Sequence, residues 1–435
     1  MQLIICIIYI SLNEQGSSRT HRKMCRCNGV KERSGPMINP KCRRGYPQPS
    51  PLVALLRLLG VVTGATLLSA CQPSDASNQV TAAATPEELG QRLFFDTNLS
   101  QHRTQSCASC HDPSHAFVDP DGTPVSLGDD GHSVGTRNAP TASYAAFSPF
   151  FEQLEDGRYR GGQFHDGRAN DLAEQALGPP LNPVEMGLPD AESVVERLRE
   201  NAYYRASFSS LYGAGVLDDS DRGFKAMGDA IAAFEKTELF SPFDSKYDRY
   251  LRGEYQMTPE EELGRTLFFS QQFTNCNQCH QLHSSQRHPQ ETFTNYEFHN
   301  IGVPVNPALA NSAPDGGLAE NSRVSGEQYR GQIKVPTLRN VAVTGPYMHN
   351  GVFQDLRTVI LFYDHYNSRN PARAINPETG KPWGDPEVDA NLSLEELTFG
   401  PALDDRRVDA LVAFLKTLTD ERYEPLLAKQ AAPES

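Results

Sequence analysis

The sequence predicts a mainly α-helical fold that consists of two similar halves with long loops. Three observations support this prediction. Apolar residues recur at three- and four-residue spacing in four segments, which are residues 191–200, 226–237, 355–366 and 404–418. The alternating pattern of a half-buried strand is scarce. A helix-start pattern also occurs twice, once near residue 85 and once near residue 258.

The repeated pattern begins with Thr-Pro-Glu-Glu and runs on to Leu-Phe-Phe. It covers residues 85–95 and, with one extra Glu, residues 258–269. Threonine is a favourable N-cap, proline suits the first helical position, and acidic side chains stabilise the first turn. We therefore expect a helix at the start of each half. We place the two domains at residues 85–250 and 251–435.

Length and composition exclude several classes of protein. The chain of 435 residues is long enough for two or three domains, and its 38% hydrophobic content argues against wholesale disorder. Its 33 Gly and 31 Pro show no short period, which excludes a collagen-like chain. A net charge of −14 gives no basic surface for nucleic acid, so no nucleic-acid partner is expected.

The first 71 residues differ in charge from the rest of the chain. They hold ten Lys and Arg against two Asp and Glu, a balance of +8, which leaves 30 against 52, or −22, for residues 72–435. Residues 52–70 are apolar, follow a basic stretch and end in Leu-Ser-Ala before Cys71. This pattern resembles a bacterial lipoprotein signal in which Cys71 is lipidated, and a lone transmembrane helix is the alternative.

We interpret residues 37–71 as the signal peptide, residues 1–36 as a non-native extension and residues 72–84 as a flexible linker. The expected location is the periplasm, with a lipid anchor as the attachment to a membrane. Gln72 weakly favours the outer membrane, because an aspartate after the lipidated cysteine usually retains bacterial lipoproteins in the inner membrane.

The four cysteines after Cys71 form two Cys-x-x-Cys-His motifs. These are Cys107, Cys110 and His111 in the first half, and Cys276, Cys279 and His280 in the second. C-x-x-C-H is the attachment motif of c-type haem. Two thiols one helical turn apart bond the two vinyl groups, and the adjoining imidazole reaches the iron. The sequence therefore predicts two covalent haem c groups, one in each of two cytochrome c-like domains.

Zinc and thioredoxin-like redox chemistry are the rival interpretations of these cysteines. A structural zinc site with two cysteine pairs places the pairs about 15–20 residues apart, whereas these pairs lie 169 residues apart. A redox pair would not explain a histidine after both motifs. Haem attachment alone is compatible with an electron-transfer protein or a redox sensor. A peroxidase also needs an open iron site with an acid–base group beside it.

Three further segments carry a resemblance to a known family. They read RNAPT at residues 137–141, F-x-DGRA-x-x-x-x-x-QA-x-GP-x-x-NPVEM at residues 164–186, and PTLRNVAVTGPYMHNG at residues 336–351. With the two haem motifs, this ordered set resembles the bacterial di-haem cytochrome c peroxidase superfamily, which also contains the MauG-type enzyme of methylamine utilisation. The resemblance covers about residues 85–420.

The resemblance implies a peroxide-reducing haem in the N-terminal half and an electron-accepting haem in the C-terminal half. His111 and His280 match the proximal iron ligands. Glu185 would take a proton from one peroxide oxygen and return it to the other, while Gln175 orients the substrate. Taken alone, Glu185 would be interpreted as a surface carboxylate and Gln175 as a polar position on a helix.

The resemblance further implies a calcium ion between the two halves. Its ligands would be the side-chain oxygen of Asn138 and the carbonyl oxygens of Thr344 and Pro346, which are hard donors of the kind that Ca²⁺ prefers. Without the resemblance, Asn138 would be interpreted as a turn residue. Members of this family are often dimers, so a homodimer is a further expectation.

The chain departs from the family in the loop before the RNAPT segment. Peroxidases of the family often carry there a removable histidine ligand in a Gly-His-Gly context. Here residues 128–132 read Gly-Asp-Asp-Gly-His, so His132 is displaced, and His115 is another candidate. His132 is otherwise a solvated loop residue in a segment rich in Gly and Asp. We therefore expect the N-terminal haem iron to be five-coordinate without reductive activation.

A second departure concerns the sixth ligand of the C-terminal haem. In the peroxidases this ligand is a methionine fourteen residues after the histidine that corresponds to His349, and here that position is Tyr363. Met348 is the only methionine after the second haem motif. Tyr363 continues an apolar stripe with Leu356, Val359 and Ile360, so a core role is the alternative. A tyrosine occupies this place in the MauG-type enzyme, which favours Tyr363 as a ligand.

The third departure removes an aromatic residue between the haems. The family has a tryptophan ten residues before the glutamine that matches Gln175, and here His165 takes its place. The only tryptophan of the chain is Trp383. Because imidazole is harder to oxidise than indole, a tryptophan-mediated hopping route is disfavoured.

These observations favour an enzyme that reduces hydrogen peroxide to water with electrons from a small cytochrome c or cupredoxin. The acidic body would attract a donor with a basic face, although acidity also serves solubility. Two alternatives remain open: a MauG-type oxidase that modifies a protein substrate, and a di-haem electron-transfer or redox-sensing protein without catalytic activity.

Overall fold

The structure is a computed structural model that describes residues 81–309 and 313–430. The predicted extension at residues 1–36, the signal peptide at residues 37–71 with Cys71, and most of the linker at residues 72–84 lie outside the described residues. Among residues 81–309 and 313–430, no helix is both long and apolar enough to cross a membrane.

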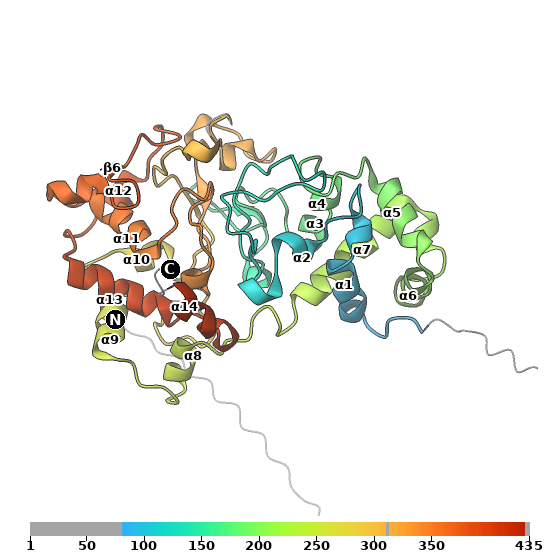
Figure 1. Ribbon diagram of the computed structural model, residues 1–435, viewed down its shortest axis with the longest axis horizontal. Helices are drawn as coiled ribbons and strands as arrows, with labels where there is room; N and C mark the ends of the chain where they lie inside the picture. The colour runs from blue at the N-terminus through green and yellow to red at the C-terminus, as the bar shows by residue number, and fades with distance from the viewer. Residues whose placement is uncertain (1–80, 310–312, 431–435) are drawn as a thin grey trace, which may run out of the picture. The chain divides into compact units, whose positions relative to one another are not determined.

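The fold is mainly helical, as the sequence predicts, and long loops connect the helices (Figure 1). The α-helices of the first half are α1 (Pro86–Phe94), α2 (Cys107–Cys110), α3 (Leu172–Gln175), α4 (Gly178–Leu181), α5 (Ala191–Glu200), α6 (Ala202–Tyr212), α7 (Ser220–Glu235) and α8 (Lys246–Leu251). Those of the second half are α9 (Pro259–Phe268), α10 (Cys276–Cys279), α11 (Leu356–His365), α12 (Leu394–Leu397), α13 (Asp405–Lys416) and α14 (Glu424–Gln430).

The strands are short and pair in three antiparallel ladders of two strands each within the described residues. The pairs are β1 (Glu152–Gln153) with β2 (Tyr159–Arg160), β3 (Phe298–His299) with β4 (Ile333–Lys334), and β5 (Ile375–Asn376) with β6 (Lys381–Pro382). Two-residue strands cannot form a core. The helices therefore supply the buried surface of both halves.

The repeated sequence pattern forms equivalent helices at the start of each half. In α1 the hydroxyl of Thr85 accepts a hydrogen bond from the Glu88 N–H at 3.3 Å, and in α9 the hydroxyl of Thr258 accepts one from the Glu261 N–H at 3.2 Å. In both helices proline occupies the first turn together with acidic residues. The expected helix starts are therefore confirmed.

Each of these helices crosses a long helix from the end of its own half, and a glycine allows the close approach. Helix α1 lies beside α7, and α9 lies beside α13 (Figure 1). A side-chain carbon at Gly90 would clash with the carbonyl oxygen of Ala230, and one at Gly264 would clash with that of Ala410. The duplication therefore extends from the sequence to the packing of the two helix pairs.

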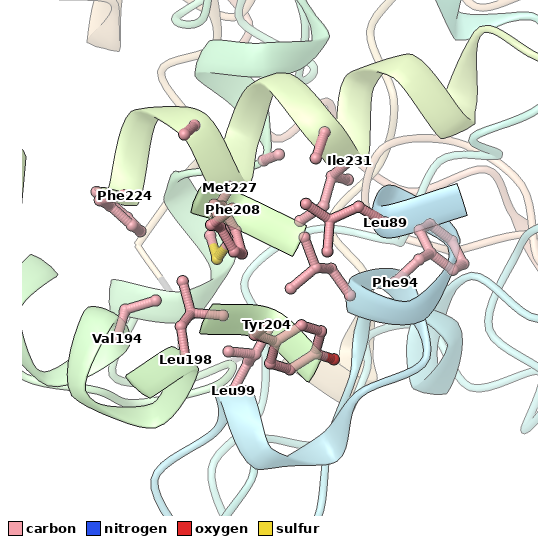
Figure 2. Close-up of a cluster of buried hydrophobic side chains, with 14 of the residues drawn as sticks. Leu89, Phe94, Leu99, Val194, Leu198, Tyr204, Phe208, Phe224, Met227 and Ile231 are labelled. Carbon is pink, nitrogen blue, oxygen red and sulfur yellow. The ribbon is translucent and has the colours of Figure 1, made fainter. Parts of the chain in front are cut away.

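The two halves have separate hydrophobic cores. Figure 2 shows part of the first, in which side chains of α1, α5, α6 and α7 converge, among them Leu89, Phe94, Val194, Leu198, Tyr204, Phe208, Met227 and Ile231. The second core includes Tyr247, Phe268, Phe293, Phe353, Phe362, Trp383 and Phe414. Because α8 contributes Tyr247 to the second core, this helix packs with the C-terminal half.

Buried polar contacts join the halves. The hydroxyl of Tyr144 donates to Asp420 at 2.6 Å. Within the C-terminal core, the fully buried guanidinium of Arg339 pairs with Asp248 of α8 at 2.6 Å. Arg339 also lies 5.3 Å from the centre of the Tyr144 ring. These contacts connect residues that are far apart in the sequence. They connect the loop that holds Tyr144 to the C-terminal half.

The amphipathic windows locate the core helices, with differences at their ends. The window at residues 191–200 coincides with α5, and those at residues 355–366 and 404–418 lie within one or two residues of α11 and α13. Helix α7 begins at Ser220, six residues before the window at residues 226–237, because Asp219 caps it by accepting from the Arg222 N–H at 3.0 Å. The first turn is polar, so hydrophobic periodicity does not detect it.

Candidate active site and haem-binding sites

The first haem motif forms the one-turn helix α2, and its histidine is oriented by the backbone. The Cys107 and Cys110 side chains are half-buried, one turn apart. Nδ1 of His111 lies 3.1 Å from the carbonyl oxygen of Phe117. Because a carbonyl only accepts, Nδ1 carries the proton, and Nε2 is the nitrogen available to an iron ion.

The second motif repeats this arrangement. Helix α10 spans Cys276–Cys279, and Nδ1 of His280 lies 3.1 Å from the carbonyl oxygen of Phe293. Burial lowers the pKa of His280 to about 4, so the imidazole is neutral at physiological pH, as a metal ligand must be. Phe117 and Phe293 both have a left-handed backbone, with φ of 57° and 56°. Each aims its carbonyl at the histidine of its own half.

Burial raises the pKa of all four thiols, which argues against thiolate chemistry. Burial raises the pKa of Cys107 and of Cys279 to about 12, and that of Cys110 to about 11. Redox-active Cys-x-x-Cys pairs have lowered pKa values instead. Among the described residues, no three Cys, His, Asp or Glu side chains are arranged to hold a metal ion.

The second motif opens into a cavity of about 400 Å³ that fits a flat, mostly apolar cofactor. Cys276, Cys279 and His280 line one part of it. The stripe of α11 that the sequence indicates, Leu356, Val359, Ile360 and Tyr363, also lines it. Apolar walls beside two thiols and a neutral imidazole are the surroundings that a covalently attached haem needs.

Tyr363 projects into this cavity rather than into a packed core. The side chain keeps 36% of its surface accessible, and it lines the cavity with His280. Burial, together with the nearby thiols of Cys279 and Cys276, holds the pKa of the Tyr363 hydroxyl well above its usual value of 10.0. Met348 lines the same cavity. The structure thus brings both candidate ligands to the haem site of the C-terminal half.

Glu185 lies in a turn that is connected through Asp129 to the segment before the first haem motif. It follows α4 in a tight turn, where its N–H donates to the carbonyl oxygen of Asn182 at 3.0 Å and its Oε1 accepts from Asn182 Nδ2 at 2.8 Å. Burial raises its pKa, and this effect outweighs the Asn182 hydrogen bond and the charge of Arg168. Its carbonyl oxygen accepts from the Asp129 N–H at 2.7 Å, and Asp129 Oδ1 accepts from the Thr104 N–H at 3.4 Å, so Glu185 is connected to the segment just before Cys107.

Gln175 is the last residue of α3, and close helix packing positions it. A side-chain carbon at Gly228 of α7 would lie 2.6 Å from the carbonyl oxygen of Ala173, so the two helices touch through their backbones. Asp171 caps α3 by accepting from the Glu174 N–H at 2.9 Å. Gln175 is half-buried at the end of this helix, at the start of the segment that leads to Glu185.

The histidines considered as removable iron ligands occupy surface positions. His132 is exposed at the tip of the loop that contains Asp129 and Asp130, and its N–H donates to Asp130 Oδ1 at 2.8 Å. The side chain of His115 is 45% exposed, and its Nδ1 lies 3.0 Å from the hydroxyl of Ser114.

His165 lies where the halves meet, and Trp383 does not. Nε2 of His165 donates to the carbonyl oxygen of Asn138 at 2.9 Å, and burial and the charge of Arg137 lower its pKa to about 4. The ring is therefore neutral. Trp383 is buried in the second core against Phe353 and Phe362, with its Nε1 donating to the carbonyl oxygen of Arg373 at 2.6 Å.

The three residues expected to bind calcium are among the residues that line the same cavity. Asn138, Thr344 and Pro346 come from different halves of the chain but all contribute to its lining. Asn138 donates its Nδ2 to the carbonyl oxygen of Pro124 at 3.1 Å, which leaves its side-chain oxygen to bind a cation. The oxygen chemistry of these residues is compatible with Ca²⁺, and the calcium site stays a prediction.

Comparisons with known proteins agree with this geometry. The family profile described as di-haem cytochrome c peroxidase matches residues 84–256. The methylamine utilization protein MauG of Paracoccus denitrificans is 55% identical over 356 residues, which cover 80% of this chain and 91% of that protein. The chain belongs to the di-haem cytochrome c peroxidase family.

Further relatives show that the family includes peroxidases. Cytochrome c551 peroxidase of Nitrosomonas europaea is 34% identical over 68% of this chain and 79% of that protein. The crystal structure of the diheme peroxidase BthA from Burkholderia thailandensis superimposes with a TM-score of 0.68 at 34% identity, over 79% of this chain and 88% of that chain. Family membership implies two haem c groups, and both Cys-x-x-Cys-His motifs of this di-haem protein fit them.

Several contributors to these sites have no signal in the sequence. The carbonyls of Phe117 and Phe293 orient the two histidines, but any residue type carries a carbonyl. Lys334 lines the cavity and has a pKa lowered by burial to about 8, yet it resembles an ordinary strand residue in the sequence. Asn182 could have been found, because it lies three residues before Glu185 in the NPVEM segment.

Proposed function

We propose that this di-haem protein reduces hydrogen peroxide to water in the N-terminal half with electrons that a small redox protein delivers to the C-terminal half. The observation that carries the proposal is the position of Glu185: its carbonyl oxygen accepts from the Asp129 N–H at 2.7 Å, and the Asp129 carboxylate accepts from Thr104, three residues before Cys107. Burial also raises the pKa of the Glu185 carboxyl. An electron carrier has no need for an acid–base group at that place. A peroxidase does.

Cys107, Cys110 and His111 would hold the haem at which peroxide binds, and that haem supplies the iron and the electrons that break the O–O bond. The overall reaction consumes one H₂O₂, two electrons and two protons and yields two H₂O. The Glu185 carboxylate would accept a proton from one peroxide oxygen and return it to the other. Gln175 orients the substrate through its amide.

The surface position of His132 supports direct access of peroxide to the N-terminal haem. Because the imidazole is exposed at the tip of its loop, we infer that His111 is the sole protein ligand of that iron in the resting state. On this proposal the ferric enzyme reacts with peroxide without prior reduction.

Cys276, Cys279 and His280 would hold the second haem, and Tyr363 would be its sixth ligand. A phenolate oxygen stabilises ferric iron and lowers the reduction potential relative to a thioether. The electron donor would be a small cytochrome c or a cupredoxin with a basic face, because residues 72–435 carry a net charge of −22. The protein would act in the periplasm, with a lipid anchor at Cys71 that favours the outer membrane.

Calcium and self-association complete the proposal. A Ca²⁺ ion bound by Asn138, Thr344 and Pro346 would join segments from both halves, and its removal with a chelator would loosen the haem surroundings. The enzyme could be a homodimer, as is common in the family.

A second candidate function is that of a MauG-type oxidase that removes electrons from a protein substrate. Two observations favour it: the 55% identity to MauG of Paracoccus denitrificans, and Tyr363 in the haem cavity. His165 argues against it, because a neutral imidazole is a poor relay for electron holes. The two candidates share the peroxide chemistry of Glu185 and differ in the source of electrons.

Stopped-flow spectroscopy of the ferric protein with hydrogen peroxide tests the shared step. We expect rapid consumption of peroxide without prior reduction, and a loss of about 10²-fold or more in Glu185→Gln with both haem spectra intact. Spectral inertness in every redox state would leave an electron-transfer or sensing role. Steady turnover with a reduced small cytochrome c or cupredoxin supports the peroxidase, whereas turnover only with a protein substrate supports the oxidase.

A further inference from the structure

The loop at residues 126–135 forms a small hairpin against the candidate active site. The Gly135 N–H donates to the carbonyl oxygen of Ser126 at 2.9 Å, and the Gly128 N–H donates to that of Ser133 at 2.7 Å. The exposed Asp130 closes the tip, where its carboxylate accepts from the N–H and the hydroxyl of Ser133. The next acid along the chain, Asp129, points the opposite way into the protein.

Asp129 is buried, with 7% of its surface exposed, and it is saturated with hydrogen bonds. Its Oδ2 accepts from the backbone N–H of His102 at 2.6 Å and lies 2.7 Å from His102 Nδ1. Its Oδ1 accepts from the N–H and the hydroxyl of Thr104. Burial by itself raises the pKa of Asp129, but the bonds from Thr104, Ser100 and His102 lower it to about 2. The carboxylate is therefore ionised throughout the working range.

The segment that holds Asp129 leads directly to the first haem motif. His102 and Thr104 lie three to five residues before Cys107. A second contact strengthens the attachment of the loop, since Gln105 Nε2 donates to the carbonyl oxygen of Leu127. The base of the hairpin is thus attached to the segment before Cys107 by hydrogen bonds to the buried carboxylate of Asp129.

The backbone of Asp129 also holds the backbone of Glu185. The Asp129 N–H donates to the carbonyl oxygen of Glu185 at 2.7 Å. A side-chain carbon at Gly128 would lie 2.9 Å from the carbonyl oxygen of Val184, so the hairpin lies directly against the turn that carries Glu185. Asp129 therefore joins three segments: the approach to the haem motif, the hairpin and the Glu185 turn.

We propose that Asp129 is a positioning residue for Glu185. Its buried carboxylate fixes the hairpin to the segment that leads to Cys107, and its backbone N–H holds the Glu185 turn at the first haem site. The inference rests on the proposed function of Glu185 as the proton carrier. The inference adds that Asp129 keeps the Glu185 carboxylate in place, so that the hairpin does not have to rearrange before the reaction.

Cyanide binding to the ferric protein with both haems attached tests the positioning. HCN must lose its proton to bind ferric iron, so its association rate reports the nearby base without any peroxide turnover. We expect Asp129→Asn to slow cyanide association about 10-fold or more, because a neutral amide cannot accept all the hydrogen bonds that hold the hairpin. Asp221→Asn is the matched control, with the same change of charge at an exposed position of α7 outside the hairpin, and should stay within about twofold of wild type.

A double-mutant cycle separates positioning from a general structural role. If Asp129 acts through Glu185, Asp129→Asn should slow cyanide association no further in a Glu185→Gln background. Equal slowing in both backgrounds, or an unchanged rate in Asp129→Asn with full haem content, would overturn the inference. If Asp129→Asn fails to retain haem, His102→Asn replaces it, since it removes one donor to the same carboxylate and should produce a smaller effect that also disappears in Glu185→Gln.

The two proposals can fail independently. The proposed function would be refuted and the positioning retained by the following pair of results. The wild-type protein does not reduce peroxide, and cyanide association is slower in Asp129→Asn and in Glu185→Gln but not in the control variant. Normal peroxide turnover in Asp129→Asn, together with a large loss in Glu185→Gln, would retain the function and overturn the positioning.

Discussion

A carboxylate that burial shields from water keeps its proton to higher pH, and Glu185 is in this situation. Burial raises its pKa above the ordinary value of 4.5, although Asn182 and Arg168 act in the opposite direction. The proposed reaction starts from the ionised form, since only a carboxylate can accept the proton of the peroxide. Peroxide reduction should therefore slow at acid pH, where Glu185 is protonated.

We expect kcat/KM for peroxide to fall as the pH drops through a value above 4.5, because Glu185 is then protonated. In Glu185→Gln this acid limb should disappear and leave a low rate that is flat with pH. The pH profile of stopped-flow peroxide consumption measures both. An unchanged acid limb in the variant would assign the titration to another group.

Tyr363→Phe tests the ligand assigned to the second haem. Loss of a phenolate ligand should change the low-spin EPR signal and raise the reduction potential of that haem. Tyr366→Phe, at the C-cap just beyond α11, is the control, because the Tyr366 hydroxyl donates to the carbonyl oxygen of Ile301 at 3.1 Å. Identical spectra for Tyr363→Phe and wild type would mean that Tyr363 merely lines the cavity.

At the scale of residues, the sequence predicts functional side chains better than functional backbone groups. The haem motifs could be assigned from their spacing alone, while Glu185, Gln175 and Tyr363 depended on a family resemblance. The carbonyls of Phe117 and Phe293 could not be predicted, because their role follows from a left-handed backbone and not from a side chain. The same holds for the N–H of Asp129 that holds Glu185.

At the scale of elements, two helix crossings depend on glycine. Gly90→Ala and Gly264→Ala should each lower the free energy of unfolding by at least about 1–3 kcal/mol, the range for overpacked cores, because the added methyl group meets a backbone carbonyl. Gly135→Ala is the control, since its nearest neighbours would lie at an ordinary 3.7 Å. Urea unfolding of the haem-loaded protein measures all three. Equal free energies of unfolding for the three variants would show that the two helix pairs can move apart to accommodate the methyl group.

The same elements show what patterns can and cannot predict. Amphipathic spacing found α5, α11 and α13 because each presents a continuous apolar stripe to a core. It missed α6 (Ala202–Tyr212), whose apolar residues surround the helix, and the polar first turn of α7. The repeated Thr-Pro-Glu-Glu pattern predicted the starts of α1 and α9, since capping is local chemistry.

At the scale of the whole molecule, charge should govern the encounter with the electron donor. Residues 72–435 carry a net charge of −22, so the association rate with a basic donor should fall steeply as ionic strength rises. An acidic donor of similar size should react slowly at low salt and gain speed as salt is added. Rates that are independent of ionic strength for both donors would show that the acidity serves solubility alone.

The central claim is that the two haem sites differ, with one iron open to peroxide and the other closed by two protein ligands. Low-temperature EPR of the ferric protein tests this most directly. The account predicts one high-spin signal from the His111 site and one low-spin signal from the His280 site, in equal amounts. Two low-spin signals, with no high-spin iron in the resting protein, would contradict it.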